Sequence, residues 1–257
     1  MTRGIIGYTG FVGGNLMRQS TFEKCYNSKN IESIAGEKLD LLVCAGAPAV
    51  KWLANKEPDR DKASLDRLMR SLSQVKADKC VLVSTVDVYP TPIDVDETTP
   101  IDTENLHPYG KHRLELESFV GDRFDCAIVR LPALFGEGLK KNIIYDFLHQ
   151  NQVEKIHCDH VFQFYNLEYL WQDIQQVLAN NLHLVNFATE PIAVGDIARE
   201  AFGFEFTNRP HNKPIRYDMK TRYGDRLGKG ASSYLYERSC ILQDLNEFVK
   251  TQSQKPT

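Results

Sequence analysis

The chain has 257 residues, of which 42% are hydrophobic and 25% charged, and its formal net charge at pH 7 is −3. This composition is that of an ordinary globular protein and excludes a disordered chain, a collagen-like repeat or a coiled coil. It has no basic excess of the kind that nucleic-acid-binding proteins carry, and no apolar run approaches the ~18 residues of a membrane span. The first residues run directly into a strand pattern, so no signal peptide is expected. We predict a cytoplasmic protein with no nucleic-acid and no membrane partner.

The first half of the chain predicts a parallel sheet. Short apolar runs, typical of strands buried on both faces, alternate with segments of helical period. Such alternation favours right-handed crossovers and a doubly wound α/β fold of the Rossmann type. The predicted strands are residues 4–6, 22–26, 39–45, 79–84 and 126–131, the predicted helices are 12–20, 59–75 and 106–120, and residues 27–38 leave room for one short helix.

The pattern changes after about residue 136, where a smaller mixed α/β lobe is expected. Helices are predicted at 142–150, 167–180, 194–202 and 239–251, a strand at 182–188, a loop at 208–233 and a frayed tail at 252–257. We therefore predict a nucleotide-binding domain at residues 1–136 and a substrate-binding lobe at residues 137–257, which interleaves with the first.

The six cysteines predict free thiols. None of them forms a C-x-x-C pair, and no group of Cys and His has the spacing of a zinc site. Cys44, Cys80 and Cys126 lie within or beside apolar runs, where cysteine behaves as a small buried hydrophobe. We expect a reducing environment, no disulfide and no bound metal.

A G-x-x-G-x-x-G pattern joins the first predicted strand to the first helix. Glycines allow a tight turn and let backbone N–H groups approach a pyrophosphate, toward which the helix directs its positive end. The alternative is a glycine-rich turn without a ligand, but its place on the first strand of an α/β series favours dinucleotide binding. The expected contacts are Gly7, Thr9, Gly10, Phe11, Val12 and Gly13.

The end of the second predicted strand slightly favours NADP over NAD. The acidic residue that would hold the ribose 2′-hydroxyl of NAD, about twenty positions after the glycines, is missing. Asn27, Ser28 and Lys29 stand there instead. A hydroxyl and a cation suit a 2′-phosphate, although Lys29 is equally well explained as a solvated turn residue.

Five segments then resemble the extended short-chain dehydrogenase/reductases, and more narrowly their nucleotide-sugar epimerase, dehydratase and reductase group. They cover most of the chain and occur in the order of that family. The resemblance also implies cofactor contacts at Ala45, Gly46 and Pro132. The segments are G-Y-T-G-F-V-G at 7–13, V-C-A-G at 43–46, S-T-V-D-V-Y at 84–89, Y-G-K-H-R at 109–113 and R-L-P-A-L-F-G at 130–136.

The resemblance implies that Tyr109 exchanges a proton with the substrate while Thr85 holds the same substrate oxygen. A free phenol has a pKa of about 10, which a neighbouring cation can lower by about 1–3 units. The phenol would then serve a sugar hydroxyl or carbonyl while the nicotinamide gives or takes hydride. The alternatives are an ordinary aromatic residue at a helix start and a satisfied hydroxyl at a strand end.

The sequence departs from the family pattern at three positions. Arg113 stands where the family has Lys, and the two side chains are not interchangeable. Arg113 is therefore either a catalytic and cofactor-binding residue in an active site with altered properties, or part of a site that has lost its activity. Asp87 stands where related dehydratases have a longer Glu, which argues against dehydration; we include it among the catalytic candidates, and the alternative is a loop carboxylate that caps N–H groups. Ala133 replaces an Asn that contacts the substrate nucleotide.

Predicted substrate contacts occur in both halves. The segment around Lys51 and Trp52 is expected to be a loop at the carboxyl edge of the sheet, where such folds bind ligands. Two lysines and an Asn at a helix start suit a pyrophosphate, or form a solvated basic turn. The predicted substrate contacts are Lys51, Thr85, Asp87, Tyr89, Lys140, Lys141, Asn142 and Gln163.

These residues predict an NAD(P)-dependent oxidoreductase or epimerase that acts on a nucleotide-linked sugar, by keto reduction or through a transient keto sugar. Arg113 favours an alternative, a non-catalytic dinucleotide-binding protein with a regulatory or assembly role. A carbonyl reductase for acyclic substrates is a third reading, which would not need Lys140 and Lys141. By analogy with the fold, a homodimer through the helix at 106–120 is expected.

Overall fold

Contacts divide the chain into two units, and each unit is assembled from three segments of sequence. The computed structural model describes residues 1–227 and 233–254. The contact units differ from the predicted domains 1–136 and 137–257 at residues 91–97, 132–136 and 168–186. The division into a nucleotide-binding domain and a substrate-binding lobe at those bounds stays a prediction. The first unit comprises Met1–Pro90, Thr98–Leu131 and Glu168–Asn186, and the second comprises Thr91–Glu97, Pro132–Leu167 and Phe187–Thr257.

The first unit is built on a sheet of six parallel strands, in the order β10-β6-β4-β3-β1-β2. The chain runs from β1 outward to β2, and a single 3-10 turn at Ile31–Ile34 leads it back across β1 to β3. The predicted doubly wound α/β fold is confirmed. The strands are β1 (Arg3–Ile6), β2 (Lys24–Tyr26), β3 (Lys38–Cys44), β4 (Lys76–Thr85), β6 (Cys126–Leu131) and β10 (Leu184–Asn186).

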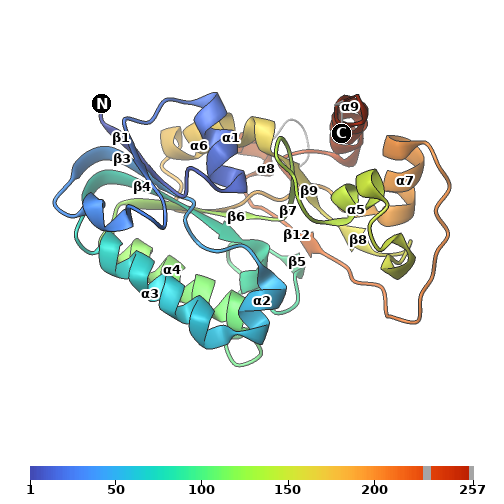
Figure 1. The fold of residues 1–257 in the computed structure, drawn as a ribbon, viewed down its shortest axis with the longest axis horizontal. Helices are drawn as coiled ribbons and strands as arrows, with labels where there is room; N and C mark the ends of the chain where they lie inside the picture. Colours follow the sequence, from blue (N-terminus) through green and yellow to red (C-terminus); the bar gives the residue numbers. More distant parts are fainter. Residues whose placement is uncertain (228–232, 255–257) are drawn as a thin grey trace. The chain divides into compact units, whose positions relative to one another are not determined.

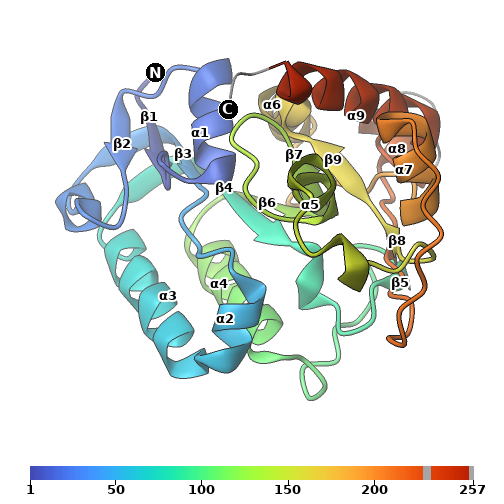
Figure 2. The same cartoon turned by 45° about the vertical axis from the view of Figure 1, so that its right-hand side comes forward.

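Helices cover both faces of this sheet. α3 and α4 lie together on one face with α2 beside them, and α1 and α6 lie on the other (Figures 1 and 2). On the first face, leucines at helical spacing in α3 and the apolar residues Leu116 and Val120 of α4 pack on sheet residues such as Leu42 and Leu82. The helices are α1 (Phe11–Gln19), α2 (Lys51–Lys56), α3 (Pro58–Leu72), α4 (Pro108–Arg123) and α6 (Leu170–Ala179).

The strand register brings several carboxyl ends to one edge of the sheet. Ile6 of β1 pairs with Cys44 of β3, which in turn pairs with Leu82 of β4. β4 continues beyond that row to Thr85, which pairs with Leu131 of β6. Ligands of doubly wound sheets bind at this edge, so the register presents Thr85 where a ligand would lie.

A buried ionic network joins α4 to the ends of three strands. Arg130 at the end of β6 donates to both carboxylate oxygens of Glu117 on α4, at 3.0 and 2.6 Å, and to the Tyr89 hydroxyl at 2.8 Å. Ser84 of β4 donates to Glu117 at 2.5 Å, and Asn186 of β10 donates to Tyr89 at 3.2 Å. Such mutual satisfaction lets charges stay buried, and it specifies how α4 sits on the sheet.

The second unit holds short strands and four helices among its described residues. Its sheets are two-stranded, and β7 and β9 pair in parallel while β8 and β11 pair antiparallel. Phe147, Phe202, Phe204 and Phe206 form an edge-to-face aromatic cluster. The elements are β5 (Ile93–Val95), β7 (Ala133–Phe135), α5 (Ile143–His149), β8 (Val161–Phe162), β9 (Phe164–Asn166), β11 (Ile192–Ala193), α7 (Val194–Phe202), β12 (Asp218–Met219), α8 (Gly224–Leu227) and α9 (Arg238–Ser253).

Three sequence expectations about local structure were wrong. Residues 51–56 form helix α2 rather than a loop, and Trp52 on it is 67% exposed. The predicted loop at 208–233 contains β12, which is held by its pairing with β5, and α8; residues 228–232 of that prediction lie outside the described residues. The predicted frayed tail begins too early, because α9 continues to Ser253; residues 255–257 also lie outside the described residues.

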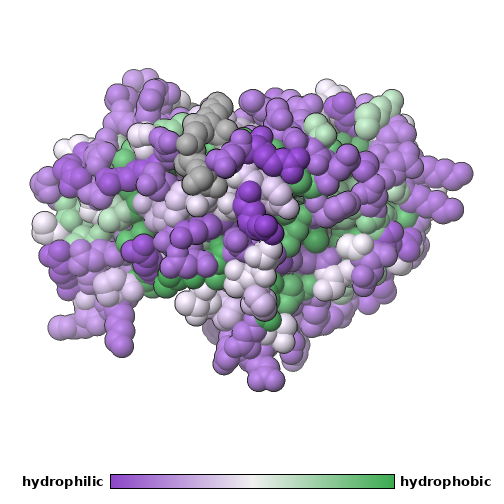
Figure 3. All heavy atoms as spheres, turned by 180° about the vertical axis from the view of Figure 1, so that it is seen from behind, coloured by the Kyte–Doolittle hydropathy of each residue, from purple (hydrophilic) through white to green (hydrophobic). Residues whose placement is uncertain are grey.

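All six cysteines carry free thiols. Burial raises the pKa of Cys44 to about 12, so this thiol stays protonated as part of the core. Within the described part of the chain, every helix is too short or too polar to cross a membrane. Hydrophilic residues cover much of the face drawn in Figure 3, and hydrophobic residues show as smaller areas between them.

Removing one partner of the buried Arg130–Glu117 pair should be costly. The change Arg130→Met leaves the Glu117 carboxylate buried without its counter-ion, and we expect the free energy of unfolding to fall by about 3–5 kcal/mol. Urea denaturation measures this. The matched control is Arg67→Met, which removes an exposed pair with Glu32 and should cost less than about 1 kcal/mol. Equal losses in the two variants would contradict a structural role for the buried network.

Candidate active site

The glycine turn leaves no room for side chains. A Cβ atom on Gly13 would lie 2.1 Å from the carbonyl oxygen of Gly7, and one on Gly7 would lie 2.3 Å from the carbonyl oxygen of Ala45. Gly7 also has a positive φ of 88°. The turn therefore packs directly against the end of β3, and it brings Gly7 together with Ala45 and Gly46, three of the predicted cofactor contacts.

Helix α1 begins without a side-chain cap. Gly10 is its N-cap residue, and neither a capping side chain nor an acidic residue is present in the first turn. Thr9 and Gly10 are exposed, and Phe11 and Val12 are half-buried. Uncapped N–H groups and the positive end of the helix together form a setting that favours an anion such as a pyrophosphate.

The turn after β2 is stabilised by its own asparagines. Asn27 accepts a hydrogen bond from the Lys29 backbone N–H at 2.9 Å, and Asn30 accepts one from the Asn27 N–H at 2.7 Å. The side chains of Ser28 and Lys29 are exposed. Asn27 thus shapes the turn, whereas Ser28 and Lys29 are presented to solvent at the edge strand of the sheet.

Two hydroxyl groups meet at the end of β4. The side chain of Thr85 lies beside the Tyr109 phenol and lowers its pKa, and Thr85 accepts a hydrogen bond from the Asp87 N–H at 3.2 Å. Gly110 makes this approach possible, because a Cβ there would lie 2.2 Å from the Asp87 carbonyl oxygen. The first turn of α4 therefore places the Tyr109 phenol beside Thr85, which is the arrangement that the sequence predicted.

A lysine and a carboxylate stand beside this hydroxyl pair. Lys51 at the start of α2 forms an ion pair with Asp87, at 2.7 Å between Nζ and Oδ1. The lysine side chain is 39% exposed and the aspartate side chain 16% exposed. The charges of both also act on Tyr109, so these four predicted residues belong to one constellation within the first unit.

Tyr109 keeps its proton at neutral pH. Burial raises the pKa of the phenol, and the charge of Asp87 raises it further. The charges of Arg113 and Lys51 and the hydrogen bond with Thr85 lower this pKa, but the net shift is upward. Tyr109 is thus a proton donor in the resting protein.

Arg113 does not extend toward the Tyr109 hydroxyl. Its guanidinium lies over the face of the Tyr109 ring, 3.8 Å from the ring centroid, and is bound at two points by Asp61 of α3. Arg113 is 3% exposed. The structure therefore places the cation beneath the aromatic ring.

Sequence reasoning missed two residues that hold Tyr109 in place. Asp61 binds Arg113, and Asn55 of α2 accepts a hydrogen bond from the Tyr109 N–H at 3.0 Å. One signal for Asp61 was present, because it stands at helical spacing from Leu65, Leu68 and Leu72 and so is a carboxylate on the apolar face of α3. Nothing in the local sequence distinguishes Asn55.

The other predicted substrate residues are engaged elsewhere or exposed. Tyr89 belongs to the buried network around Arg130 and is 2% exposed. In the second unit, Asn142 caps α5 by accepting a hydrogen bond from the Ile144 N–H at 3.0 Å. The side-chain amide of Gln163 donates to the carbonyl oxygens of Thr189 and Met219 and accepts from the Met219 N–H. The two remaining substrate residues, Lys140 and Lys141, are both exposed, and partial desolvation of its amino group lowers the pKa of Lys141. Pro132, a predicted cofactor contact, is buried and begins a segment of the second unit.

One group of side chains in the second unit has the composition of a metal site. The ligand atoms of His157, Cys158 and Asp159 lie within 4.8 Å of one another. However, Asp159 is paired with Arg209 at 2.8 Å, and burial raises the pKa of the Cys158 thiol. A metal ion would have to displace both the arginine and the thiol proton. Sequence reasoning missed the group because three consecutive residues match no zinc spacing.

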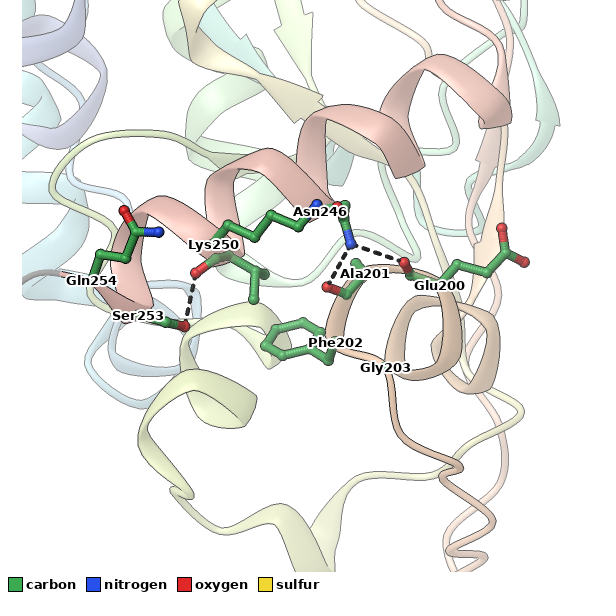
Figure 4. Close-up of a pocket in the computed structure, with 9 residues that line it drawn as sticks. Glu200, Ala201, Phe202, Gly203, Asn246, Lys250, Ser253 and Gln254 are labelled. Atoms are coloured by element: carbon green, nitrogen blue, oxygen red, sulfur yellow. Dashed lines mark hydrogen bonds between the residues drawn. The ribbon is translucent and has the colours of Figure 1, made fainter.

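A pocket of about 370 Å³ lies in the second unit between α7 and α9 (Figure 4). Asn246 of α9 donates to the backbone oxygens of Glu200 and Ala201 of α7, at 3.2 and 3.3 Å, and so joins the two helices. Within α9, Ser253 donates to the Val249 carbonyl at 2.9 Å. None of the predicted site residues lines this pocket, which therefore contributes nothing to the constellation around Tyr109.

No family model and no curated protein matches the chain. Solved structures do match over nearly the whole chain. An NAD-dependent NDP-hexosamine 5,6-dehydratase of tunicamycin biosynthesis has a TM-score of 0.70 at 18% identity, covering 100% of this chain and 99% of its own. The dTDP-4-dehydrorhamnose reductase from Yersinia enterocolitica has a TM-score of 0.73 at 16% identity, and the match covers 98% of this chain and 99% of the reductase. The UDP-N-acetylglucosamine 4-epimerase from Methanobrevibacter ruminantium M1 has a TM-score of 0.72 at 13% identity, and the match covers 99% of each chain. These proteins share the fold of this chain, so the predicted resemblance is confirmed for the fold.

The glycine turn provides a matched pair of substitutions. Gly13→Ala forces a Cβ against the Gly7 backbone, and we expect it to lower the free energy of unfolding by about 1–3 kcal/mol. Gly14→Ala places its Cβ 3.8 Å from the Tyr8 carbonyl oxygen, an ordinary contact, and should be neutral or stabilising by up to about 1 kcal/mol. Thermal and urea unfolding of both variants measure the difference. A turn that tolerated both changes equally would contradict the observed packing.

Proposed function

We propose that this chain, which has the fold of the extended short-chain dehydrogenase/reductases, is an NAD(P)-dependent oxidoreductase or epimerase of nucleotide-linked sugars. The observation that carries the proposal is that the Tyr109 phenol and the Thr85 hydroxyl lie side by side at the carboxyl edge of the parallel sheet. A glycine turn with no room for side chains lies in the same unit, against the end of β3. A hydroxyl pair and a phosphate-binding turn are the two parts that nicotinamide chemistry on a carbonyl requires.

The glycine turn fits a dinucleotide. The space that a Cβ would fill at Gly7 and Gly13 lets a pyrophosphate approach the backbone, and the uncapped start of α1 favours its charge. One structural neighbour is described as NAD-dependent, and another from Pseudomonas aeruginosa was determined with NADPH. We assign the cofactor to Gly7, Gly10, Gly13, Ala45 and Gly46, and we favour NADP because Ser28 and Lys29 are exposed at the end of β2.

The nicotinamide would supply or accept the hydride. Tyr109 gives its phenolic proton to the substrate oxygen as a carbonyl carbon is reduced, and takes a proton from a hydroxyl in the reverse direction. Thr85 donates to the same oxygen and holds it within reach of the phenol. The upward shift of the Tyr109 pKa suits the reductive direction, because the phenol enters the reaction protonated.

We place Lys51 and Asp87 on the substrate. Their ion pair lies beside Tyr109, and a lysine has three N–H groups, so it can hold Asp87 and still donate to a sugar hydroxyl. The same pairing favours reduction or epimerisation over dehydration, since the carboxylate is already engaged by a cation. For the pyrophosphate of the substrate we propose Lys140 and Lys141.

A second candidate function is a non-catalytic dinucleotide-binding protein with a regulatory or assembly role. The observation that favours it is the engagement of the Arg113 guanidinium by Asp61, which leaves the cation bound by protein beneath the tyrosine ring. This reading predicts nucleotide binding without turnover. The two candidate functions are distinguished by whether turnover depends on the Tyr109 hydroxyl.

Nucleotide binding tests the shared part of both readings. We expect protein stripped of cofactor to bind NADPH with a micromolar Kd, and Lys29→Met to weaken NADPH about tenfold while NADH is unaffected, because a charge-assisted bond to the 2′-phosphate is lost. Nicotinamide fluorescence titration measures both. The control is Lys24→Met, an exposed lysine at the start of β2. NADH binding at least as tight as NADPH would contradict the NADP preference.

Turnover tests the catalytic reading. We expect Tyr109→Phe to lower kcat at least about 100-fold on the keto-sugar nucleotide that the wild type reduces best, since the phenolic proton is lost. dTDP-4-dehydrorhamnose and the 4-keto derivative of UDP-N-acetylglucosamine make a suitable panel. NADPH binding by the variant serves as the control for folding. Undiminished kcat in Tyr109→Phe would refute the assignment, and binding without any wild-type turnover would favour the non-catalytic role.

A further inference from the structure

Arg113 is bound by a carboxylate from another helix. Asp61 on α3 accepts two hydrogen bonds from its guanidinium, at 2.5 Å from Nη1 and 2.8 Å from Nη2. Asp61 also lies 2.8 Å from Nδ1 of His112. Burial raises the pKa of Asp61, but the hydrogen bonds from Arg113 and His112 outweigh it, and the pKa lies below its usual value. The pair is therefore ionised and bidentate.

The terminal nitrogens of Arg113 are fully engaged by protein. Nη1 also donates to the Tyr109 carbonyl at 3.2 Å, and Nη2 donates to the Pro48 carbonyl at 2.5 Å. Both nitrogens thus use two acceptors each, which matches their four N–H groups. The Nε atom is buried, with no hydrogen-bond partner among the described residues. Arg113 has no terminal N–H left to donate to a bound cofactor.

Tyr109 is held on four sides as a result. Its N–H binds Asn55, its carbonyl and its ring face bind Arg113, and its hydroxyl lies beside Thr85. A cation beneath an aromatic ring is attracted to the ring and fixes its plane. Without Asp61, Arg113 would be a buried cation with only neutral acceptors, and such a charge leaves its site or unfolds it.

We propose that Asp61 is a positioning residue for Tyr109, which acts by fixing Arg113 beneath the aromatic ring and thereby withholding it from the cofactor. The inference rests on the proposed function. In the resembled family a lysine occupies position 113. Here the position holds an arginine, and the planar Asp61 carboxylate binds both terminal nitrogens of its guanidinium, a geometry that a lysine could not form. Arg113 then contributes fixed charge and ring orientation, and it contributes no contact to the nucleotide.

The charged groups around the Tyr109 phenol determine how the pH dependence of kcat can test the role of Arg113. Lys51 of α2 and Asp87 after β4 face Tyr109 together with Arg113, and the ring of His107 lies 6.2 Å from the tyrosine ring. Of the cations, Arg113 lowers the Tyr109 pKa more than Lys51 does. Loss of Arg113 should therefore raise the pKa of the phenol, and with it the apparent pKa of the alkaline limb of kcat in the reductive direction, where Tyr109 gives the proton.

The experiment compares Asp61→Asn, Arg113→Met and the double variant Asp61→Asn/Arg113→Met. Each single change leaves a buried group without its partner and is expected to lower the Tm. The double variant removes both charges, so its Tm should return toward that of the wild type. The matched control is Lys62→Met/Glu115→Gln, which removes an exposed ion pair between the same two helices.

In the double variant we expect kcat on the panel substrate to fall at least about tenfold, with the alkaline limb moved to higher pH. The Kd for NADPH should stay within about twofold, because a lost contact would cost about tenfold or more. The control variant should keep kcat, the pH limb and Kd unchanged.

Three results would overturn the inference. A Kd for NADPH weakened tenfold would show that Arg113 contacts the cofactor. An unchanged kcat and pH limb beside an altered Tm would show that the pair only supports the fold. A wild type that binds neither NADPH nor NADH would refute the proposed function and this inference with it, and the nucleotide titration made first distinguishes that case from the other two.

Discussion

Helix α4 is fixed by two buried ion pairs, and the candidate site depends on them. Arg113 near its start pairs with Asp61 of α3, and Glu117 one turn later pairs with Arg130 of β6. All four side chains are at most 5% exposed, so each pair is desolvated and is favourable only when its geometry is complete. Because Tyr109 stands at the start of this helix, its position relative to Thr85 follows from that geometry.

The polar groups of the first unit serve two different purposes. The Glu117–Arg130 network is closed, since its members satisfy one another and stay buried among strand ends. The group at Lys51, Asp87 and Tyr109 is open, because the lysine is partly exposed and the tyrosine keeps its proton. The closed network provides rigidity, and the open group is where we propose that a substrate exchanges protons. Tyr89, which the motif alone assigns to substrate, belongs to the closed network.

Most of the fold and part of the site were predictable from local patterns. Short apolar runs identified β1, β2, β3, β4 and β6 of the main sheet, and the glycine spacing identified the turn between β1 and α1, because both signals are local. Trp52 and the loop at 208–233 were misplaced, since α2 is a short helix and β12 forms only by pairing with β5, far away in the chain. Asn142 and Gln163 looked like ligand contacts, but their amides are consumed by backbone groups.

The sequence by itself determined the alternation of strands and helices in the main sheet and the glycine turn between β1 and α1. These features depend on residue type and spacing, which the chain carries directly. Only the tertiary structure showed which groups surround Arg113. Its partner Asp61 lies 52 residues away, and a cation can be assigned to a cofactor or to a carboxylate only when the groups that surround it are known.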